Sequence, residues 1–239
     1  MSGLVVITGA TGGIGRLVAM EVAKAGGVPV IGYRSPKREV AQALAAACGG
    51  VLIEMDMTIP SSIDSGLAAI LADGRPVIGA VLAASPKPVI APFGKITPED
   101  HALFWSANVV GPHHLLSGLL RLFFRPRKSG AVVAVLSKAM DVGDSAGKRP
   151  KAMSGMGAYT ISKYGLQGVM AQLAGEFDWL TTACVFPSFT ETDMLNAFDS
   201  RFVDQLRASN QIAGPEGVVL EIVKKLDMDI LSPKAEGAL

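Results

Sequence analysis

The chain has 239 residues, of which 49% are hydrophobic and 18% charged, and its net charge is +1. This balance excludes an intrinsically disordered chain, and the near-neutral charge gives no electrostatic basis for binding nucleic acid or an acidic membrane surface. No apolar run approaches the ~20 residues that a membrane-spanning helix needs.

Short apolar runs without polar alternation are typical of parallel strands that are buried on both faces. In chain order, they predict strands at 4–8, 28–33, 51–55, 77–83, 131–137 and 182–186. Helical patterns separate these runs at 14–25, 36–47, 60–71, 98–124 and 158–179. The alternation predicts an α/β fold, a doubly wound parallel sheet of Rossmann type in a single domain over residues 1–239.

Two segments interrupt this alternation. Residues 138–157 are polar and rich in glycine, and we expect a long variable loop there. Residues 194–211 predict a short helix, which is either a substrate lid or an ordinary amphipathic surface helix. Residues 229–231 indicate one last strand before the end of the chain. Cys48 and Cys184 belong to no CxxC pair, which favours buried, reduced thiols in a cytoplasmic protein.

The first predicted strand runs into a glycine-rich loop and then into a helix. This order brings backbone N–H groups and a helix N-terminus against a pyrophosphate, and glycine permits the close approach. The sequence therefore predicts a dinucleotide site. The residues expected to hold the pyrophosphate are Gly9, Thr11, Gly12, Gly13, Ile14 and Gly15.

The end of the second strand distinguishes the two nicotinamide dinucleotides. A carboxylate there would bond the adenosine 2′-hydroxyl of NAD, whereas an arginine would accommodate the 2′-phosphate of NADP. Tyr33 stands in the place of that acid, Arg34 follows it, and Lys37 and Arg38 are close behind. The cations favour NADP, and NAD is the less favoured cofactor.

Asp56 and Met57 follow the third predicted strand and are expected beside the adenine. The Asp56 carboxylate either accepts a hydrogen bond from the adenine amine or caps its own turn. Both alternatives agree with the sequence.

Tyr159 and Lys163 are separated by one helical turn, so they share a helix face. A tyrosine with a pKa near ~10 is a poor base at neutral pH, and a neighbouring cation lowers that pKa. A tuned phenol beside a dinucleotide predicts proton transfer coupled to hydride transfer.

From "TGATGGIG" through "NVVG" at Asn108 and "YTISK" at Tyr159 to "PSFTET" at Pro187, the chain resembles the short-chain dehydrogenase/reductase family. The resemblance implies a nicotinamide cofactor, hydride transfer between an alcohol and a carbonyl, and a constellation of Ser, Tyr, Lys and Asn. Tyr159 would be the general acid/base, and Lys163 would lower its pKa and bond the nicotinamide ribose. Asn108 would anchor a water from a kink in its helix.

The family's serine polarises the substrate oxygen, and three serines compete for that role. Ser137 ends the fifth predicted strand, where the family's serine is expected, but its separation from Tyr159 exceeds the usual gap. Ser145 fits the gap better, and Ser154 is a remote third option. Because sheets fix strand ends while loop insertions cost little free energy, we favour Ser137.

The chain departs from the family pattern after the fourth strand and after the sixth. "LAAS" replaces the usual asparagine-containing stretch, so this strand end is expected to be held by backbone bonds alone. After the sixth strand a serine replaces the usual glycine, whereas two threonines that can bond a carboxamide remain. The further residues expected at the cofactor are Ala83, Ala84, Pro187, Thr190 and Thr192.

The leading hypothesis is therefore an NADP(H)-dependent oxidoreductase acting on a small to medium carbonyl or alcohol substrate. The alternatives are a non-catalytic NADP-binding sensor of the same fold, and an epimerase or dehydratase that regenerates its cofactor. The family often pairs the helices of Asn108 and Tyr159 across a two-fold axis, so we expect a homodimer or homotetramer. The three histidines form no metal-ligand pattern, and no metal is expected.

Overall fold

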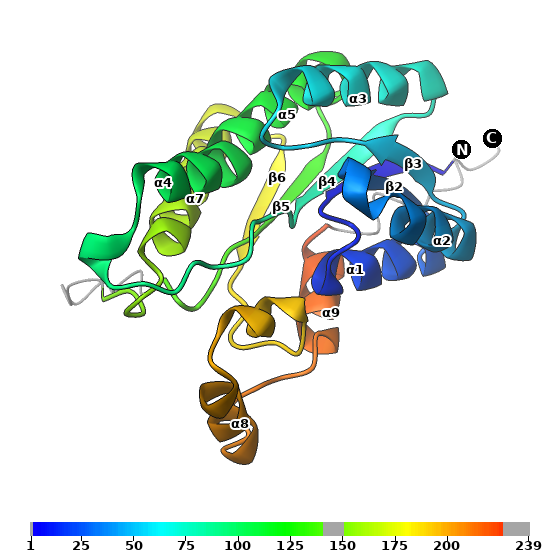
Figure 1. Ribbon diagram of the computed structural model, residues 1–239. Helices are drawn as coiled ribbons and strands as arrows, with labels where there is room; N and C mark the ends of the chain where they lie inside the picture. The colour runs from blue at the N-terminus through cyan, green and yellow to red at the C-terminus, as the bar shows by residue number, and fades with distance from the viewer. Residues whose placement is uncertain (1, 141–150, 227–239) are drawn as a thin grey trace, which may run out of the picture.

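The computed structural model describes residues 2–140 and 151–226. Within these residues, one sheet of six parallel strands has the order β3-β2-β1-β4-β5-β6 (Figure 1). This sheet confirms the predicted α/β fold of Rossmann type. The strands are β1 (Leu4–Thr8), β2 (Val28–Tyr33), β3 (Val51–Glu54), β4 (Val77–Leu82), β5 (Ala131–Val135) and β6 (Thr181–Val185).

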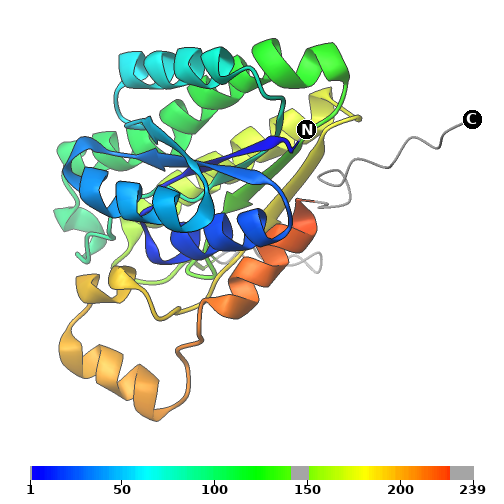
Figure 2. The ribbon, with the colours of Figure 1, turned by 90° about the vertical axis from the view of Figure 1, so that its right-hand side faces the viewer.

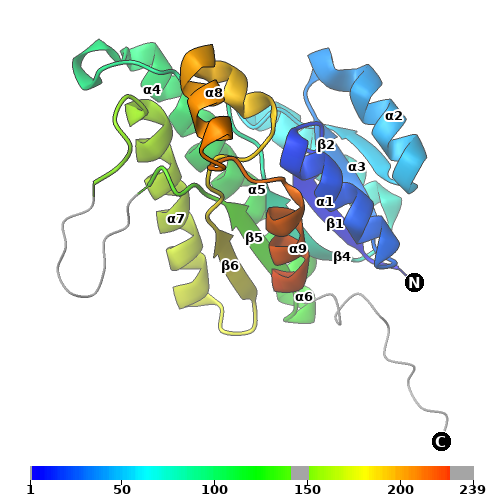
Figure 3. The same cartoon turned by 90° about the horizontal axis from the view of Figure 1, so that it is seen from below.

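Helices cover both faces of the sheet, as Figure 2 shows most clearly. One face carries α3, α5 and α7, and the other carries α1, α2 and α9, which are seen from outside in Figure 3. None of the helices in the described part of the chain is long and apolar enough to cross a membrane. The helices are α1 (Gly13–Lys24), α2 (Arg38–Cys48), α3 (Pro60–Asp73), α4 (Pro98–Trp105), α5 (Gly111–Leu119), α6 (Arg125–Arg127), α7 (Gly157–Glu176), α8 (Ser200–Ala208) and α9 (Glu216–Lys225).

Burial on both faces explains why the strand sequences lack polar alternation. Along β1, Leu4 and Val6 belong to the core beneath α3, α5 and α7, whereas Val5 and Ile7 belong to the core beneath α1, α2 and α9. Each of these four side chains is at most 1% exposed. Successive residues of a strand point to opposite faces, so a sheet covered on both sides requires an unbroken apolar run.

The predicted elements differ from the observed ones mainly at their ends and within one helix. The expected helix at 98–124 contains two π-helical turns, Ser106–Val110 and Leu120–Phe124, between α4, α5 and α6. The expected helix at 194–211 divides into a 3₁₀ turn, Asp193–Ala197, and α8. Helix α9 was not predicted, and the strand expected at 229–231 lies outside the described residues. Cys48 and Cys184 are free thiols, as expected, but they are only partly buried.

The strand order places a topological switch at β1. β1 pairs with β2 on one side and with β4 on the other, so the chain runs outward from β1 to β2 and β3 and then crosses over to β4 and the opposite edge of the sheet. In sheets of this kind the loops at the carboxyl ends of the strands separate at the switch and leave a crevice for a ligand.

Candidate active site

A cleft of about 570 Å³ lies along the carboxyl ends of the strands. Every residue that the sequence predicted at the cofactor lines this cleft, as do Ser137, Tyr159 and Lys163. The structure therefore brings together segments that are far apart in the chain. The cofactor set is Gly9, Thr11, Gly12, Gly13, Ile14, Gly15, Tyr33, Arg34, Asp56, Met57, Ala83, Ala84, Tyr159, Lys163, Pro187, Thr190 and Thr192.

The glycine loop is too tightly packed to accept side chains at two of its positions. Gly9 has a φ of +65°, and a Cβ added there would lie 2.7 Å from the Ala84 Cα. A Cβ on Gly15 would lie 2.4 Å from the Gly9 carbonyl oxygen. Helix α1 begins beside these glycines without a side-chain cap, so its N-terminus is available to an anion in the cleft. These features fit the pyrophosphate of a dinucleotide.

The end of β4 is held by a side chain of β1, not by backbone bonds alone as the "LAAS" stretch suggested. Thr8 is 2% exposed, and its Oγ1 donates to the Val81 carbonyl oxygen at 3.4 Å. The Thr8 Oγ1 also accepts a hydrogen bond from the Ala84 N–H at 3.2 Å. A hydroxyl on the neighbouring strand thus helps to hold a strand end that lacks the asparagine side chains usual at this position.

The end of β2 presents cations to the cleft. Arg34 and Lys37 are exposed and line it, whereas Tyr33 is 4% exposed and packs in the core beside it. Asp56 also lines the cleft, and its Oδ1 accepts bonds from the Thr58 N–H at 2.8 Å and the Thr58 hydroxyl at 2.7 Å. These contacts agree with the capping alternative for Asp56. A contact with adenine stays a prediction.

Tyr159 lies near the start of α7 with 7% of its surface exposed. Its ring meets the Phe104 ring edge to face at 6.2 Å between centroids, and the Ser137 side chain lies beside its hydroxyl. Burial raises the pKa of the Tyr159 phenol, and the interaction with the Ser137 side chain offsets part of that rise. The sequence predicted a lowered pKa for Tyr159. The pKa is raised instead, because desolvation of the phenol outweighs its interaction with Ser137.

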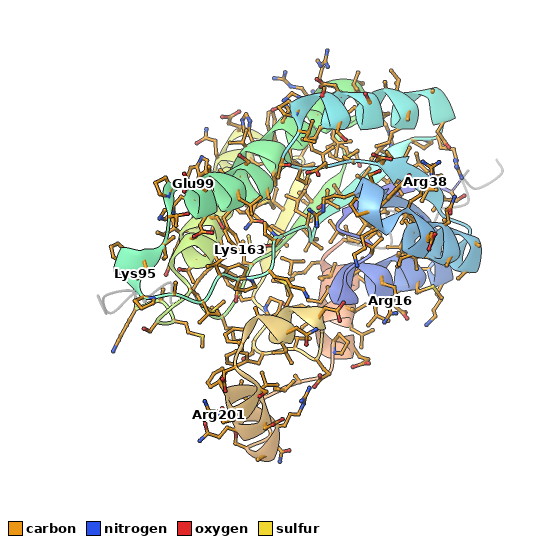
Figure 4. The ribbon with its side chains drawn as sticks, in the orientation of Figure 1. Arg16, Arg38, Lys95, Glu99, Lys163 and Arg201 are labelled. Atoms are coloured by element: carbon orange, nitrogen blue, oxygen red, sulfur yellow. The ribbon has the colours of Figure 1, made fainter. Side chains whose placement is uncertain are left out.

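Lys163 is 2% exposed and lies on the inner side of α7 (Figure 4). Its Nζ donates to the Val135 carbonyl oxygen at 2.8 Å and lies 5.6 Å from the centroid of the Tyr159 ring. Because burial disfavours the charged form, the pKa of Lys163 falls from 10.5 to about 8. The Lys163 Nζ thus lies over the face of the Tyr159 ring, and within the described residues no hydrogen bond joins it to the phenolic oxygen.

The depressed pKa of Lys163 predicts a pH dependence of stability. Between about pH 8 and pH 10.5 the unfolded chain binds a proton at this residue that the folded chain does not. The free energy of unfolding of the wild type should therefore rise across this window, by roughly 3 kcal/mol relative to Lys163→Met. Urea unfolding of both proteins, without added nucleotide, measures the difference. Parallel pH profiles would contradict a neutral amine in the folded state.

Asn108 lies in the first π-helical turn, fully buried and behind the cleft rather than on its surface. Its Nδ2 donates to the Ser162 Oγ at 2.8 Å, and the Ser162 hydroxyl donates to the Tyr159 carbonyl oxygen at 2.7 Å. The Asn108 Oδ1 has no hydrogen-bond partner in the described part of the chain. A buried carbonyl oxygen without a partner can accept a hydrogen bond from a water molecule.

Sequence reasoning missed several residues of this site. Ser162, between Tyr159 and Lys163 in "YTISK", is buried and ties Asn108 to α7, and its helical spacing from Tyr159 is a usable signal. No sequence pattern indicated a role for Thr8, because its hydrogen-bond partners, Val81 and Ala84, belong to β4 and the residues after it. The further lining residues used below are Lys87, Lys138, Met153, Met156, Phe189, Asp193, Met194 and Phe198.

Two expectations about the site remain without a structural counterpart. Ser145 lies outside the described residues, so its place relative to Tyr159 is not part of this structure. Among residues 2–140 and 151–226, no group of three histidine, cysteine or carboxylate side chains is placed to hold a metal ion.

Comparisons with known proteins agree on one family. The model of the short chain dehydrogenase family matches residues 3–201. FabG of Aggregatibacter actinomycetemcomitans, a 3-oxoacyl-acyl-carrier-protein reductase, is 29% identical over 203 residues, which cover 82% of this chain and 79% of that protein.

Two solved structures share the fold. A short-chain dehydrogenase from Streptomyces avermitilis has a TM-score of 0.76 at 23% identity, over 95% of this chain and 84% of that one. A ribose-5-phosphate isomerase from Brucella melitensis 16M has a TM-score of 0.82 at 20% identity, over 97% of this chain and 87% of that one. Together with the match over residues 3–201, the cleft and its residues lead to one conclusion: the chain belongs to the short-chain dehydrogenase/reductase family of oxidoreductases, which bind a nicotinamide cofactor.

Proposed function

We propose that the protein is an NADP(H)-dependent carbonyl reductase, or the corresponding alcohol dehydrogenase, for a small to medium organic substrate. The observation that carries this proposal is that Tyr159 and Ser137 lie beside each other in the cleft that the glycine loop also lines. Two neighbouring hydroxyls can both reach one substrate oxygen.

When bound, the nicotinamide cofactor supplies the hydride. Ser137 donates a hydrogen bond to the substrate carbonyl and stabilises the negative charge that develops on its oxygen. Tyr159 gives that oxygen a proton, and its raised pKa keeps the phenol protonated at neutral pH, which suits reduction. Lys163 bonds the nicotinamide ribose, and Asn108 holds a water through which the phenol regains its proton.

Substrate turnover tests the proposal directly. We expect the purified protein to oxidise NADPH in the presence of some members of a panel of ketones, aldehydes and quinones, followed by absorbance at 340 nm. Binding of NADPH without oxidation by any of them would favour the sensor hypothesis instead. Dinucleotide that stays bound through purification would favour an epimerase or dehydratase.

We propose NADP rather than NAD because Arg34 and Lys37 line the cleft where the 2′-phosphate would lie. Arg34→Ala should weaken NADPH binding about tenfold and change NADH binding by less than about twofold, since only the 2′-phosphate loses a charge-assisted bond. Fluorescence titration of both nucleotides measures this.

Arg38→Ala is the matched control for the Arg34 variant. Arg38 is also exposed at the start of α2, but it does not line the cleft (Figure 4). A stronger affinity of the wild type for NADH than for NADPH would contradict the assignment of Arg34.

The choice of Ser137 as the catalytic serine has its own test. Ser137→Ala should lower kcat about 100-fold, because the developing oxyanion loses a donor, and should leave NADPH affinity within about twofold. Ser145→Ala is the matched variant and should keep kcat close to that of the wild type. The reverse pattern would assign the role to Ser145.

We further propose that the protein is a cytoplasmic homo-oligomer, a dimer or a tetramer. Trp105, Val110 and Ile161 are 45%, 48% and 40% exposed, on the helices of Asn108 and Tyr159. Trp105 packs close to Gly165, one turn from Ile161, so these apolar surfaces adjoin. A two-fold interface that covers these side chains would remove apolar area from water. Light scattering after size-exclusion chromatography measures the oligomeric state.

A further inference from the structure

The end of the cleft around Tyr159 is apolar. Phe104, Met156, Ala158 and Tyr159 form a small core of their own, separate from the two cores of the sheet. Met153, Met194 and Phe198 pack against it, line the cleft and remain only partly buried. Partly buried apolar side chains at a concave surface present area that a ligand can cover.

The segment bearing Met194 and Phe198 is held in place by aromatic contacts. Phe198 lies 5.6 Å from Phe189 and 5.7 Å from Phe202, between ring centroids, and Phe202 belongs to α8. Figure 1 shows that α8 projects away from the body of the molecule. The aromatic contacts give this wall of the cleft a defined position while leaving its Met194 side chain adaptable.

Two exposed lysines line the same cleft as this apolar surface. Lys87 follows β4 and Lys138 follows Ser137, so both lie at the carboxyl ends of adjacent strands and line the cleft. Neither has an ion-pair partner in the described part of the chain. The described residues that line the cleft include two carboxylates, Asp56 and Asp193, against the exposed cations Arg34, Lys37, Lys87 and Lys138, which leaves an excess of positive charge.

This inference rests on the proposed reductase activity. We propose that the substrate is an amphipathic ketone whose apolar body lies among Met153, Met194 and Phe198. Lys87 and Lys138 hold its carboxylate or similar anionic group. Apolar walls lower the local dielectric constant, so a cation beside them attracts an anion more strongly than a lysine on a convex surface does. Lys138 directly follows Ser137, which places this attraction close to the carbonyl that Ser137 polarises.

The test uses phenyl ketones that carry a terminal carboxylate on methylene spacers of increasing length, each assayed beside its neutral methyl ester. We expect the wild type to reduce the best carboxylate with a kcat/KM about tenfold above that of its ester. Lys87→Met and Lys138→Met should each remove most of this preference and leave kcat/KM for the esters within about twofold. Methionine keeps the apolar stem of the lysine while removing its charge.

Lys95→Met is the control variant. Lys95 is exposed, does not line the cleft and lies at the tip of the segment before α4, away from Lys163 (Figure 4). This variant should keep the acid-to-ester ratio of the wild type. In addition, kcat/KM for the carboxylates, but not for the esters, should fall as ionic strength rises, because salt screens the attraction.

The outcomes separate the two proposals. Esters reduced as well as acids by the wild type, or an acid preference that survives in both lysine variants, would overturn the anion site and leave the reductase intact. Absence of turnover for every phenyl ketone would overturn the anion site, and absence of turnover for the panel of ketones, aldehydes and quinones as well, with NADPH bound normally, would overturn both.

Discussion

Tyr159→Phe is expected to lower kcat about 1,000-fold while leaving the affinity for NADPH within about threefold of the wild type. General acid–base catalysis contributes factors of about 10²–10⁴, and this substitution removes the only proton that we assign to the substrate oxygen. The phenylalanine keeps the ring that packs edge to face against Phe104, so the fold should be unaffected. Steady-state kinetics and a fluorescence titration measure the two quantities.

Tyr164→Phe is the matched control for this prediction. Tyr164 lies on the same helix and does not line the cleft, so its variant should turn over substrate within about twofold of the wild type. The raised pKa of Tyr159 adds a second readout, since the rate of reduction in the wild type should fall as pH rises through it. Turnover close to that of the wild type in Tyr159→Phe would refute the mechanism.

Gly111→Ala adds a single methyl group and is expected to lower the free energy of unfolding strongly. Gly111 begins α5, and a Cβ there would lie 2.0 Å from the Met57 carbonyl oxygen and 2.8 Å from the Met57 carbonyl carbon. Because the obstacle is backbone, it cannot rotate away, and either α5 or the loop after β3 must move. We expect a loss of roughly 3 kcal/mol or more in the free energy of unfolding.

The melting temperature of Gly111→Ala should accordingly fall by roughly 6–12 °C. Gly168→Ala is the matched control, because Gly168 is exposed on α7 and no atom lies within 4 Å of an added Cβ. Alanine favours a helix interior over glycine by about 1 kcal/mol, so this variant should melt higher than the wild type. Equal melting temperatures for the two variants would contradict the close approach of α5 to Met57.

The strands and most helices were predictable because their signals are local. A sheet buried on both faces demands uninterrupted apolar runs, and these runs ended within a few residues of the observed strands. Helix α9 was missed because it buries only Val219 and Ile222, a stripe too short to stand out. The π-helical turn at Ser106–Val110 lies where the family resemblance implied a kink at Asn108, but no local pattern of apolar residues indicates it.

The candidate site divides in the same way. The glycine loop and the Tyr159–Lys163 pair were predictable, since each depends on residues close in the sequence. The direction of the Tyr159 pKa was not, because it follows from burial beneath Phe104 and its neighbours. Lys87 and Lys138 lie in segments without periodicity, and only the folded chain shows that both line one cleft.

The hydroxyl of Thr8 has a consequence for how the wall of the cleft can vary. Its hydrogen bonds to the Val81 carbonyl and the Ala84 amide hold the end of β4 against β1. The side chains at 83, 84 and 85 therefore take no part in this attachment. Ala83 and Ala84 still pack against the cores of the sheet, whereas Ser85 lines the cleft outside both cores. A substitution at Ser85 can therefore remodel the adjoining part of the binding surface without loosening the sheet, which makes it the starting point for changing ligand preference by directed evolution.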